Sequence, residues 1–341
     1  MILKLRNIKL ITFIFILSIE IVIVILLIFN LRNIEKSSII SINPIPKDVV
    51  LFPQNDEFKH YYEPVPNSTI NLDSALITDL GYPKGTFIRY KINADGLNQL
   101  VNYTPEKPKN TYRIVILGDS FTYGLHVNTE DNYPSQLNNL LNENPICKNI
   151  NSFQVLNLGM EGYDIGYSVE RYKLIGQKYN PDLVLWFIID ADLYRINELQ
   201  IPKTVYYDAQ LKKSGKEVVL EKQGIFNTGW HMAINDIFKE LGGESKIFDL
   251  QKKYFSNFSR YYKGSLLIFD FKPSSDSIAK ELAYFKNSRK NTLLYADLPS
   301  IYNDTKNYLK DGHPSPSGDA IIAKNLYDYL IKNNVIPCQK P

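Results

Sequence analysis

The sequence predicts an α/β protein, a three-layer α/β/α sandwich around a central parallel sheet. Short apolar runs rich in β-branched residues indicate strands at residues 112–117, 153–158, 183–189, 265–271 and 292–298. Helix-length segments with an apolar face lie at residues 132–142, 165–179 and 317–332. Strands that alternate with helices favour a parallel sheet with helices on both faces.

The strand at residues 112–117 leads directly into a glycine, an aspartate and a serine, Gly118, Asp119 and Ser120. Open α/β sheets bind ligands at the carboxyl ends of their strands, so we expect Ser120 at the binding edge. A serine there becomes a nucleophile when a histidine takes its proton, and His313 follows Asp311 by two residues. Ser120, His313 and Asp311 are therefore the predicted catalytic residues, whereas Asp119 is expected to stabilise the turn through backbone N–H groups.

Composition and motif searches exclude several other classes of function. The 341 residues carry a net charge of +3, and the Lys and Arg residues are scattered, so no nucleic-acid partner is expected. The sequence lacks a phosphate-binding GxxxxGK loop, an HExxH motif, a His/Cys zinc cluster and a GxGxxG helix start. No metal or organic cofactor is implied. The histidines other than His313, namely His60, His126 and His231, have no acidic residue two positions away and receive no role.

Residues 10–29 form an apolar stretch in which only Thr12, Ser18 and Glu20 are polar. As a helix it would extend about 30 Å, the thickness of a bilayer core. A cleaved signal peptide has a shorter apolar core and a small-x-small cleavage site, and a buried core helix would need a polar face. We therefore expect a transmembrane anchor at residues 10–30, with residues 1–9 in the cytoplasm and the catalytic domain outside it. The charge bias that supports this orientation is weak.

Two further regions complete the expected organisation. The proline-rich residues 31–110 are predicted to be a juxtamembrane stalk that joins the edge of the domain at residues 85–92. The domain spans residues 111–338 and contains an insertion at about residues 194–262. Within the insertion we expect a β-hairpin and then two helices, with the strands at residues 204–211 and 217–222 and the helices at residues 230–241 and 247–262. The insertion is either decoration or a lid over the site.

The two cysteines, Cys147 and Cys338, have no metal-ligand spacing. Two buried free thiols are one interpretation. Outside the cytoplasm a disulfide is the alternative, and it requires the helices at residues 132–142 and 317–332 to be neighbours, since each cysteine closely follows one of them.

Several sequence blocks, in order, resemble the SGNH/GDSL hydrolase superfamily. They are Arg-Ile-Val-Ile-Leu-Gly-Asp-Ser-Phe-Thr-Tyr-Gly at residues 113–124, Tyr-Pro-Ser-Gln-Leu at 133–137, Val-Leu-Asn-Leu-Gly-Met-Glu-Gly-Tyr at 155–163, Asn-Pro-Asp-Leu-Val at 180–184 and Asp-Gly-His-Pro-Ser-Pro-Ser-Gly at 311–318. The resemblance covers roughly residues 90–333 without the insertion. It implies the SGNH hydrolase (flavodoxin-like) sandwich, with Ser120 as nucleophile and His313 as base. The Gly-x-Ser-x-Gly elbow of α/β-hydrolases is absent.

The resemblance also implies an oxyanion hole, from which the sequence departs at one position. The family uses the N–H of the nucleophile, here Ser120, a glycine N–H and an asparagine amide. Gly162 matches the glycine, with Gly159 as the other register. At the asparagine position the best register places Ala191.

The two residues beside Ala191, Asp190 and Asp192, offer no replacement for the asparagine amide, since an ionised carboxylate repels a developing oxyanion. Losing one oxyanion donor typically lowers kcat by a factor of about 10²–10³. Three alternatives remain. Another donor, for example from the insertion, replaces the asparagine; or the enzyme is slow; or the chain is not an enzyme.

The expected function is a membrane-anchored serine esterase or acyltransferase that forms an acyl-Ser120 intermediate. By resemblance, its substrates would be O-acyl groups, chiefly acetyl, on an envelope polysaccharide or glycolipid. One alternative is a catalytically impaired protein that binds carbohydrate or assists envelope assembly, which the missing asparagine and an aromatic-rich insertion favour. The aromatic residues concerned are Tyr206, Tyr207, Trp230 and Tyr254. A lipase or thioesterase is the second alternative.

Overall fold

The computed structural model describes residues 49–51, 55–143, 147–216 and 228–338, with backbone only at 49–51. All of them belong to the compact unit at residues 42–341. The predicted tail at residues 1–9, the predicted anchor at residues 10–30 and the hairpin strand at residues 217–222 lie outside the described residues. None of the described helices combines the length and hydrophobicity needed to cross a bilayer.

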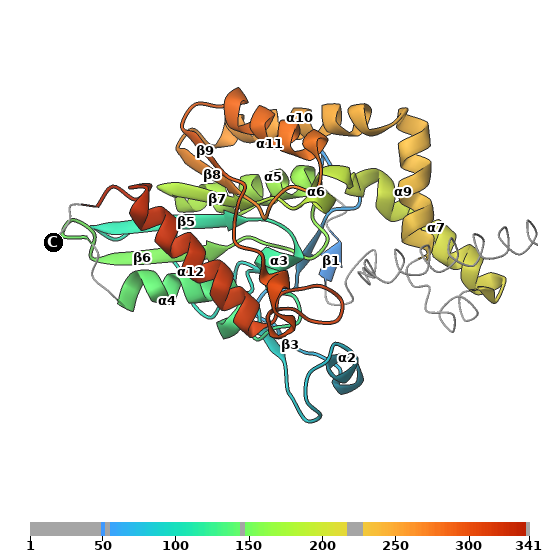
Figure 1. Cartoon of the computed structure of the whole chain (residues 1–341), viewed down its shortest axis with the longest axis horizontal. Helices are drawn as coiled ribbons and strands as arrows, with labels where there is room; N and C mark the ends of the chain where they lie inside the picture. The colour runs from blue at the N-terminus through green and yellow to red at the C-terminus, as the bar shows by residue number, and fades with distance from the viewer. Residues whose placement is uncertain (1–48, 52–54, 144–146, 217–227, 339–341) are drawn as a thin grey trace, which may run out of the picture. The chain divides into compact units, whose positions relative to one another are not determined.

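The centre of the fold is a parallel sheet of five strands in the order β6-β5-β7-β8-β9 (Figure 1). The strands are β5 (Thr111–Leu117), β6 (Ser152–Asn157), β7 (Leu183–Phe187), β8 (Ser265–Phe269) and β9 (Thr292–Tyr295). Each lies where the sequence predicts a strand. The chain adds β6 on one side of β5 and then continues on the other side with β7. The strand order therefore reverses beside β5, and such a switch point is where open α/β sheets bind ligands.

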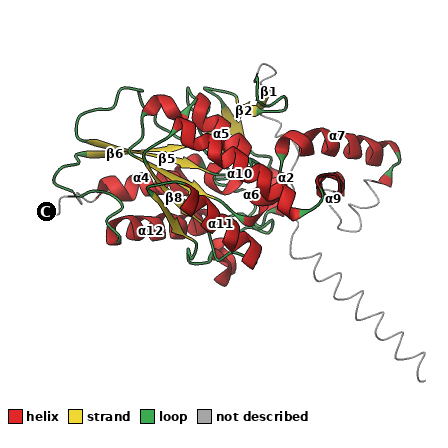
Figure 2. Ribbon diagram, turned by 90° about the horizontal axis from the view of Figure 1, so that it is seen from above, coloured by secondary structure: helices red, strands yellow, loops and turns green. Residues whose placement is uncertain are grey.

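Helices cover both faces of the sheet because the strand residues alternate between two apolar clusters. In β5, Val115 and Leu117 belong to one cluster, whereas Ile114 and Ile116 belong to the other. The first face packs against α5 (Ile165–Leu174), α10 (Glu244–Tyr261) and α11 (Asp276–Ser288). The second packs against α4 (Tyr133–Glu143) and α12 (Pro316–Lys332) (Figures 1 and 2). The arrangement is the predicted three-layer sandwich, formed by helices on both faces of a parallel sheet.

The segment before the sheet forms a third apolar cluster. Its elements are β1 (Val49–Leu51), β2 (Tyr62–Pro64), β3 (Thr69–Asn71), α2 (Ser74–Asp79) and β4 (Arg89–Lys91), with β1 paired to β2 and β3 to β4. Packing begins well before the predicted junction at residues 85–92, because Phe58, Tyr61 and Tyr62 are already buried against Tyr163 and Tyr167. Aromatic side chains, which bury large areas, hold this turn-rich segment against the domain.

The insertion is helical in the residues that the structure describes. It contains α6 (Asp190–Tyr194), α7 (Asn197–Lys213) and α9 (Thr228–Leu241), followed by α10. The predicted helices at residues 230–241 and 247–262 are confirmed as α9 and α10. The predicted strand at residues 204–211 is wrong, since these residues belong to α7. Its buried residues are Asn197, Gln200, Ile201 and Thr204, whose spacing of three, four and seven is helical and places them on one face.

Short 3₁₀ helices and one disulfide complete the described chain. The 3₁₀ helices are η1 (Thr129–Asp131), η2 (Gly176–Tyr179), η3 (Ile301–Asn303) and η4 (Thr305–Asn307). Cys147 and Cys338 form a disulfide with a Cα–Cα distance of 4.8 Å. It joins the chain beyond α4 to the chain beyond α12, and these two helices pack side by side, as the disulfide alternative requires.

Candidate active site

The turn after β5 holds Ser120 at the carboxyl edge of the sheet. Ser120 begins the short helix α3 (Ser120–Tyr123), and the Oδ1 atom of Asp119 accepts a hydrogen bond of 3.0 Å from the Phe121 N–H. Gly118 has a φ of +152°, and a Cβ there would lie 2.2 Å from Thr122 Oγ1. Only glycine fits so close to the following helix. The predicted turn-stabilising role of Asp119 is therefore seen directly.

The structure brings the three predicted catalytic side chains into one hydrogen-bonded chain. Ser120 Oγ lies 2.9 Å from His313 Nε2, and His313 Nδ1 lies 2.9 Å from Asp311 Oδ2. The Asp311 Oδ1 atom also accepts a 3.1 Å hydrogen bond from the His313 N–H, which fixes the short loop before α12. Ser120 and His313 are 3% and 2% exposed. Nucleophile, base and orienting carboxylate are thus within hydrogen-bonding reach in the order that a serine triad requires.

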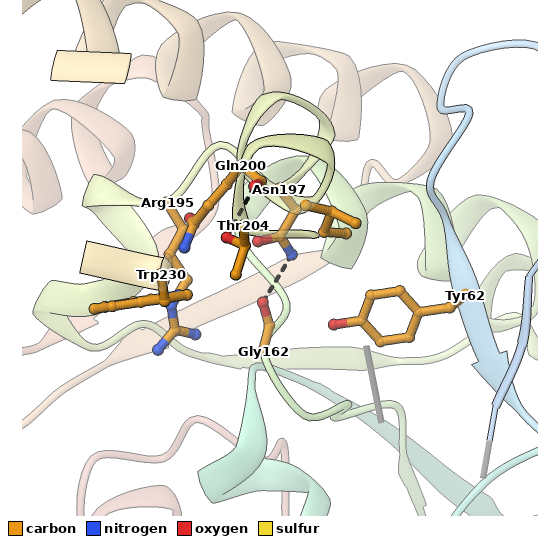
Figure 3. Close-up of a pocket in the computed structure, with 8 residues that line it drawn as sticks. Tyr62, Gly162, Arg195, Asn197, Gln200, Thr204 and Trp230 are labelled. Carbon is orange, nitrogen blue, oxygen red and sulfur yellow. Dashed lines mark hydrogen bonds between the residues drawn. The ribbon is translucent and has the colours of Figure 1, made fainter. Parts of the chain in front are cut away.

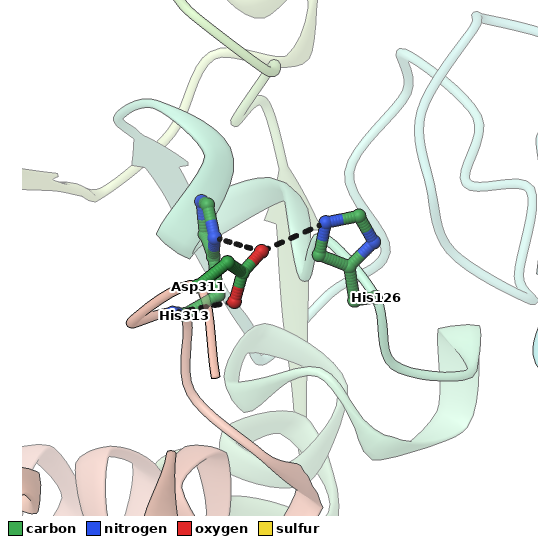
Figure 4. Close-up of side chains that lie close together, drawn as sticks. All are labelled: His126, Asp311 and His313. Atoms are coloured by element: carbon green, nitrogen blue, oxygen red, sulfur yellow. Dashed lines mark hydrogen bonds and ion pairs between the residues drawn. The ribbon is translucent and has the colours of Figure 1, made fainter. Parts of the chain in front are cut away.

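A second histidine shares the carboxylate of Asp311. His126 Nε2 lies 3.1 Å from Asp311 Oδ2, the oxygen that also binds His313 (Figure 4). The two imidazole rings are 5.5 Å apart and perpendicular. His126 could not be assigned a role from the sequence, because His126 and Asp311 lie far apart in the chain. His60 and His231 lie elsewhere, in the segment before β2 and in α9.

The pKa values of this cluster are shifted in opposite directions. Burial by itself would raise the pKa of Asp311, but hydrogen bonds from His126 and His313 outweigh burial and hold that pKa well below its usual range. Burial by itself would lower the pKa of His313, yet the hydrogen bond and charge of Asp311 raise it above 6.5. Burial lowers the pKa of His126, so His126 is neutral at pH 7. Its Nε2–H group then donates a hydrogen bond to Asp311 Oδ2.

His126, Asp311 and His313 are also the described residues whose ligand atoms lie close enough to hold a metal ion, all within 4.8 Å of one another. The three atoms are already joined by hydrogen bonds. A metal ion bound there would replace the hydrogen bond between Asp311 and His313, and His313 could then no longer act as the base. The donor set therefore fits a hydrogen-bonded triad with an additional histidine better than a resident metal.

The loop between β6 and α5 provides the predicted oxyanion glycine. The Gly159 N–H donates a 2.9 Å hydrogen bond to Asn157 Oδ1 and is therefore occupied. By contrast, the backbone N–H groups of Ser120 and Gly162 donate to no residue that the structure describes. Gly162 has a φ of +74°, a conformation that favours glycine. Of the two registers, the geometry favours Gly162.

Residues from two distant segments fix the orientation of the Gly162 loop. The Tyr62 hydroxyl of β2 donates a 2.6 Å hydrogen bond to the carbonyl of Glu161. In a trans peptide the C=O and N–H groups point in opposite directions, so this bond turns the Gly162 N–H away from Tyr62. On the other side, Asn197 of α7 donates a 2.7 Å hydrogen bond from Nδ2 to the Gly162 carbonyl (Figure 3).

No side-chain amide stands at the position where the resemblance implies an asparagine. Asp190 Oδ2 accepts a hydrogen bond from the Ser274 N–H, and Ala191 has no polar group. Asp192 is buried; its Oδ2 accepts from the Ile189 N–H and its Oδ1 lies 3.3 Å from Arg195 Nη1. Burial, with the nearby charge of Asp119, raises the pKa of Asp192 well above its usual value. None of the three residues replaces the amide.

Glu161 is an additional ionisable group beside Gly162. Burial and the negative charges of Asp311 and Asp119 raise the pKa of its carboxyl group, and the positive charges of His313 and Arg195 lower it. The net result is a pKa of about 7. The Glu161 carboxyl therefore interacts electrostatically with two members of the predicted triad, His313 and Asp311. The sequence predicted no role for it.

Comparison with known proteins gives structural similarities only. No family model matches the chain, and no curated protein sequence matches it. The structure is similar to a crystal structure of TesA, with 12% identity, a TM-score of 0.35 and coverage of 64% of this chain and 98% of the other. A lipolytic protein of the G-D-S-L family from Desulfitobacterium hafniense DCB-2 gives 18% identity, a TM-score of 0.34 and coverage of 63% and 97%.

The acetyl xylan esterase Est2A from Butyrivibrio proteoclasticus gives 14% identity, a TM-score of 0.39 and coverage of 67% of this chain and 66% of the other. All three scores are below 0.4, so the geometry of the site, and not these similarities, carries the functional conclusion.

Proposed function

We propose that this chain is a serine esterase or acyltransferase of the SGNH type that acts through an acyl-Ser120 intermediate. The observation that carries the proposal is the continuous chain from Ser120 Oγ to His313 Nε2 and from His313 Nδ1 to Asp311 Oδ2, with 2.9 Å at each step. General-base catalysis requires hydrogen-bonding distances of this kind.

In the proposed reaction Ser120 Oγ attacks the carbonyl carbon of an ester, and its proton passes to His313 Nε2. The π electrons of the carbonyl move to its oxygen and form an oxyanion. Asp311 stabilises the resulting imidazolium without accepting its proton. The oxyanion then re-forms the carbonyl, and the departing alkoxide takes the proton from His313. A water molecule or an acceptor hydroxyl repeats the sequence on the acyl-enzyme and frees Ser120.

We further propose a substrate that carries O-acyl groups, chiefly acetyl, on carbohydrate. Trp230, Gln200 and Arg195 from the insertion line a pocket together with Gly162 (Figure 3). These residues offer an aromatic face and hydrogen-bonding groups next to Gly162, whereas the substrate class itself is proposed from the sequence resemblance. Anchoring through residues 10–30, and with it an extracytoplasmic location and an envelope substrate, are likewise proposed from the sequence.

A second candidate function, a carbohydrate-binding protein without catalysis, is favoured by one observation, the lack of an amide at residues 190–192. It would use the same pocket without turnover.

The test uses a small acetyl ester and a serine-reactive phosphonate. We expect turnover and covalent labelling by the parent protein, and neither by Ser120→Ala. Ser317→Ala is the matched control, because Ser317 is an exposed serine at the start of α12 and should leave both readouts unchanged. Absence of both turnover and labelling in the folded parent protein would reject the esterase and leave the binding function.

A further inference from the structure

Arg195 is a buried cation beside the nucleophile, and the triad chemistry described above does not use it. It follows α6 directly and is 2% exposed. Its Nη1 atom lies 3.5 Å from Asp119 Oδ2, which in turn lies 3.4 Å from Ser120 Oγ. The guanidinium is therefore separated from the nucleophile by a single carboxylate oxygen.

Arg195 is paired with two carboxylates, Asp119 and Asp192, which its Nη1 atom shares at 3.5 and 3.3 Å. Its Nε–H group is buried and has no hydrogen-bond partner among the described residues, as is also true of the Nε–H group of Arg171. A buried N–H group without a partner costs about 1–3 kcal/mol, which a hydrogen bond to a ligand would offset. Arg195 differs from Arg171 in its position beside Asp119 and in the same pocket as Gly162.

Arg195 belongs to the pocket that also contains the predicted oxyanion glycine. Arg195 and Gly162 line the same pocket, and in Figure 3 the guanidinium lies beside Gly162 and below Trp230. Arg195 also lies four residues beyond Ala191, in the short helix turn that follows β7, where the resemblance places the missing amide. The guanidinium thus comes from nearly the same point of the fold, but on a longer side chain that can reach further.

We propose that Arg195 supplies the third donor of the oxyanion hole, in place of the asparagine amide. This inference rests on the proposed esterase function. When Ser120 attacks and the carbonyl electrons move to oxygen, the Arg195 N–H donates to that oxygen together with the Ser120 and Gly162 amides. The carboxylates of Asp119 and Asp192, 3.5 and 3.3 Å from Arg195 Nη1, hold the guanidinium in place in the resting site. No proton leaves Arg195, because a guanidinium stays protonated throughout.

The test compares substitutions of two buried arginines. Arg195→Lys keeps the positive charge beside Asp119 but loses the planar donor set, and Arg195→Gln keeps an amide donor alone. Both should lower kcat by about 10²-fold, with a smaller change in KM, since the lost contact forms only in the transition state. Arg113→Lys is the control, because Arg113 is equally buried and hydrogen-bonded but lies at the opposite end of β5. It should lower the melting temperature and keep kcat.

Two further measurements keep the inference testable when a variant folds poorly. In Arg195→Ala, added guanidinium ion at a non-denaturing concentration should restore part of the lost turnover and should not do so in Ser120→Ala. In the parent protein, a crystal structure of the phosphonate adduct should place an Arg195 nitrogen about 3 Å from the phosphonyl oxygen.

Folded Arg195→Lys and Arg195→Gln variants with the parent kcat would overturn the inference, as would an adduct in which Arg195 does not contact that oxygen. Neither result affects the esterase proposal, which stands or falls on turnover and labelling by the parent protein.

Discussion

The triad half of the site and the oxyanion half are encoded in different ways. Ser120 lies in a tight turn after β5, and Asp311 and His313 are two residues apart in one loop. The oxyanion half draws Tyr62 from β2, Gly162 from the loop after β6, and its remaining contacts from the insertion. Two short turns hold the members of the first half and meet in one tertiary contact, between Ser120 and His313, whereas the second half depends on several such contacts. Local sequence therefore indicates the proposed acyl-transfer chemistry. Long-range contacts would determine how well the oxyanion formed in that reaction is stabilised.

Breaking the triad half should produce the largest loss. Asp311→Asn preserves shape but removes the charge that stabilises the His313 imidazolium and fixes its tautomer. We expect kcat to fall by a factor on the order of 10³–10⁴. Steady-state hydrolysis of the acetyl ester measures it, with Asp304→Asn, at an exposed turn, as the control. A loss below tenfold would mean that Asp311 is not the orienting carboxylate. The Arg195 substitutions rank next, at about 10²-fold.

His126 connects the two halves through pH. The general base works only when His313 is neutral, so kcat/KM should rise with pH through the raised pKa of His313. His126 donates to the same Asp311 oxygen as His313, so its removal leaves that oxygen to His313 alone and raises the His313 pKa further. In His126→Leu the acidic limb should therefore move to higher pH, with a loss of about 3–10-fold on that limb for a shift of half to one pKa unit and little loss on the plateau above it.

His126→Gln is the matched control for that shift, because it can keep one N–H donor toward Asp311 and should retain a profile close to that of the parent. A limb that stays in place in His126→Leu, or that moves to lower pH, would show that His126 does not act on the triad.

Tyr62 tests the oxyanion half with the smallest expected effect. Tyr62→Phe removes one hydrogen bond to the Glu161 carbonyl and loosens the peptide that carries the Gly162 N–H. A typical hydrogen bond contributes about 0.5–1.5 kcal/mol, so kcat should fall by about 2–10-fold. Tyr262→Phe is the control, since the Tyr262 hydroxyl also donates to a backbone carbonyl, that of Ser265 at the start of β8, and not to the Gly162 loop. If both variants keep the same kcat, the Tyr62 bond serves stability alone, which thermal unfolding would show.

The same contrast explains what the sequence could and could not predict. Apolar runs predicted all five strands of the sheet, and the Gly118–Asp119–Ser120 turn predicted that Ser120 lies at its carboxyl edge. The strand predicted at residues 204–211 was wrong because β-branched and aromatic residues outweighed the helical spacing of Asn197, Gln200, Ile201 and Thr204. That spacing was available as a signal in the sequence.

The contacts of Tyr62 and His126 had no such signal, because each depends on a partner far away in the chain. Tyr62 meets Glu161 across a separation of 99 residues, and His126 likewise meets Asp311 from a distant segment. Arg195 had a partial signal. It follows Asp192 by three residues, a spacing that allows the two charges to pair on one turn of helix.

The hydrogen bond between Ser120 and His313 has a consequence for how the protein folds. It closes a separation of 193 residues, so the proposed site forms only after two distant segments of the chain have come together. Contacts this distant also slow folding, since the entropy of closing the loop is lost before the contact is gained. The proposed activity therefore depends on the completed tertiary fold and not on the Gly118–Asp119–Ser120 turn alone.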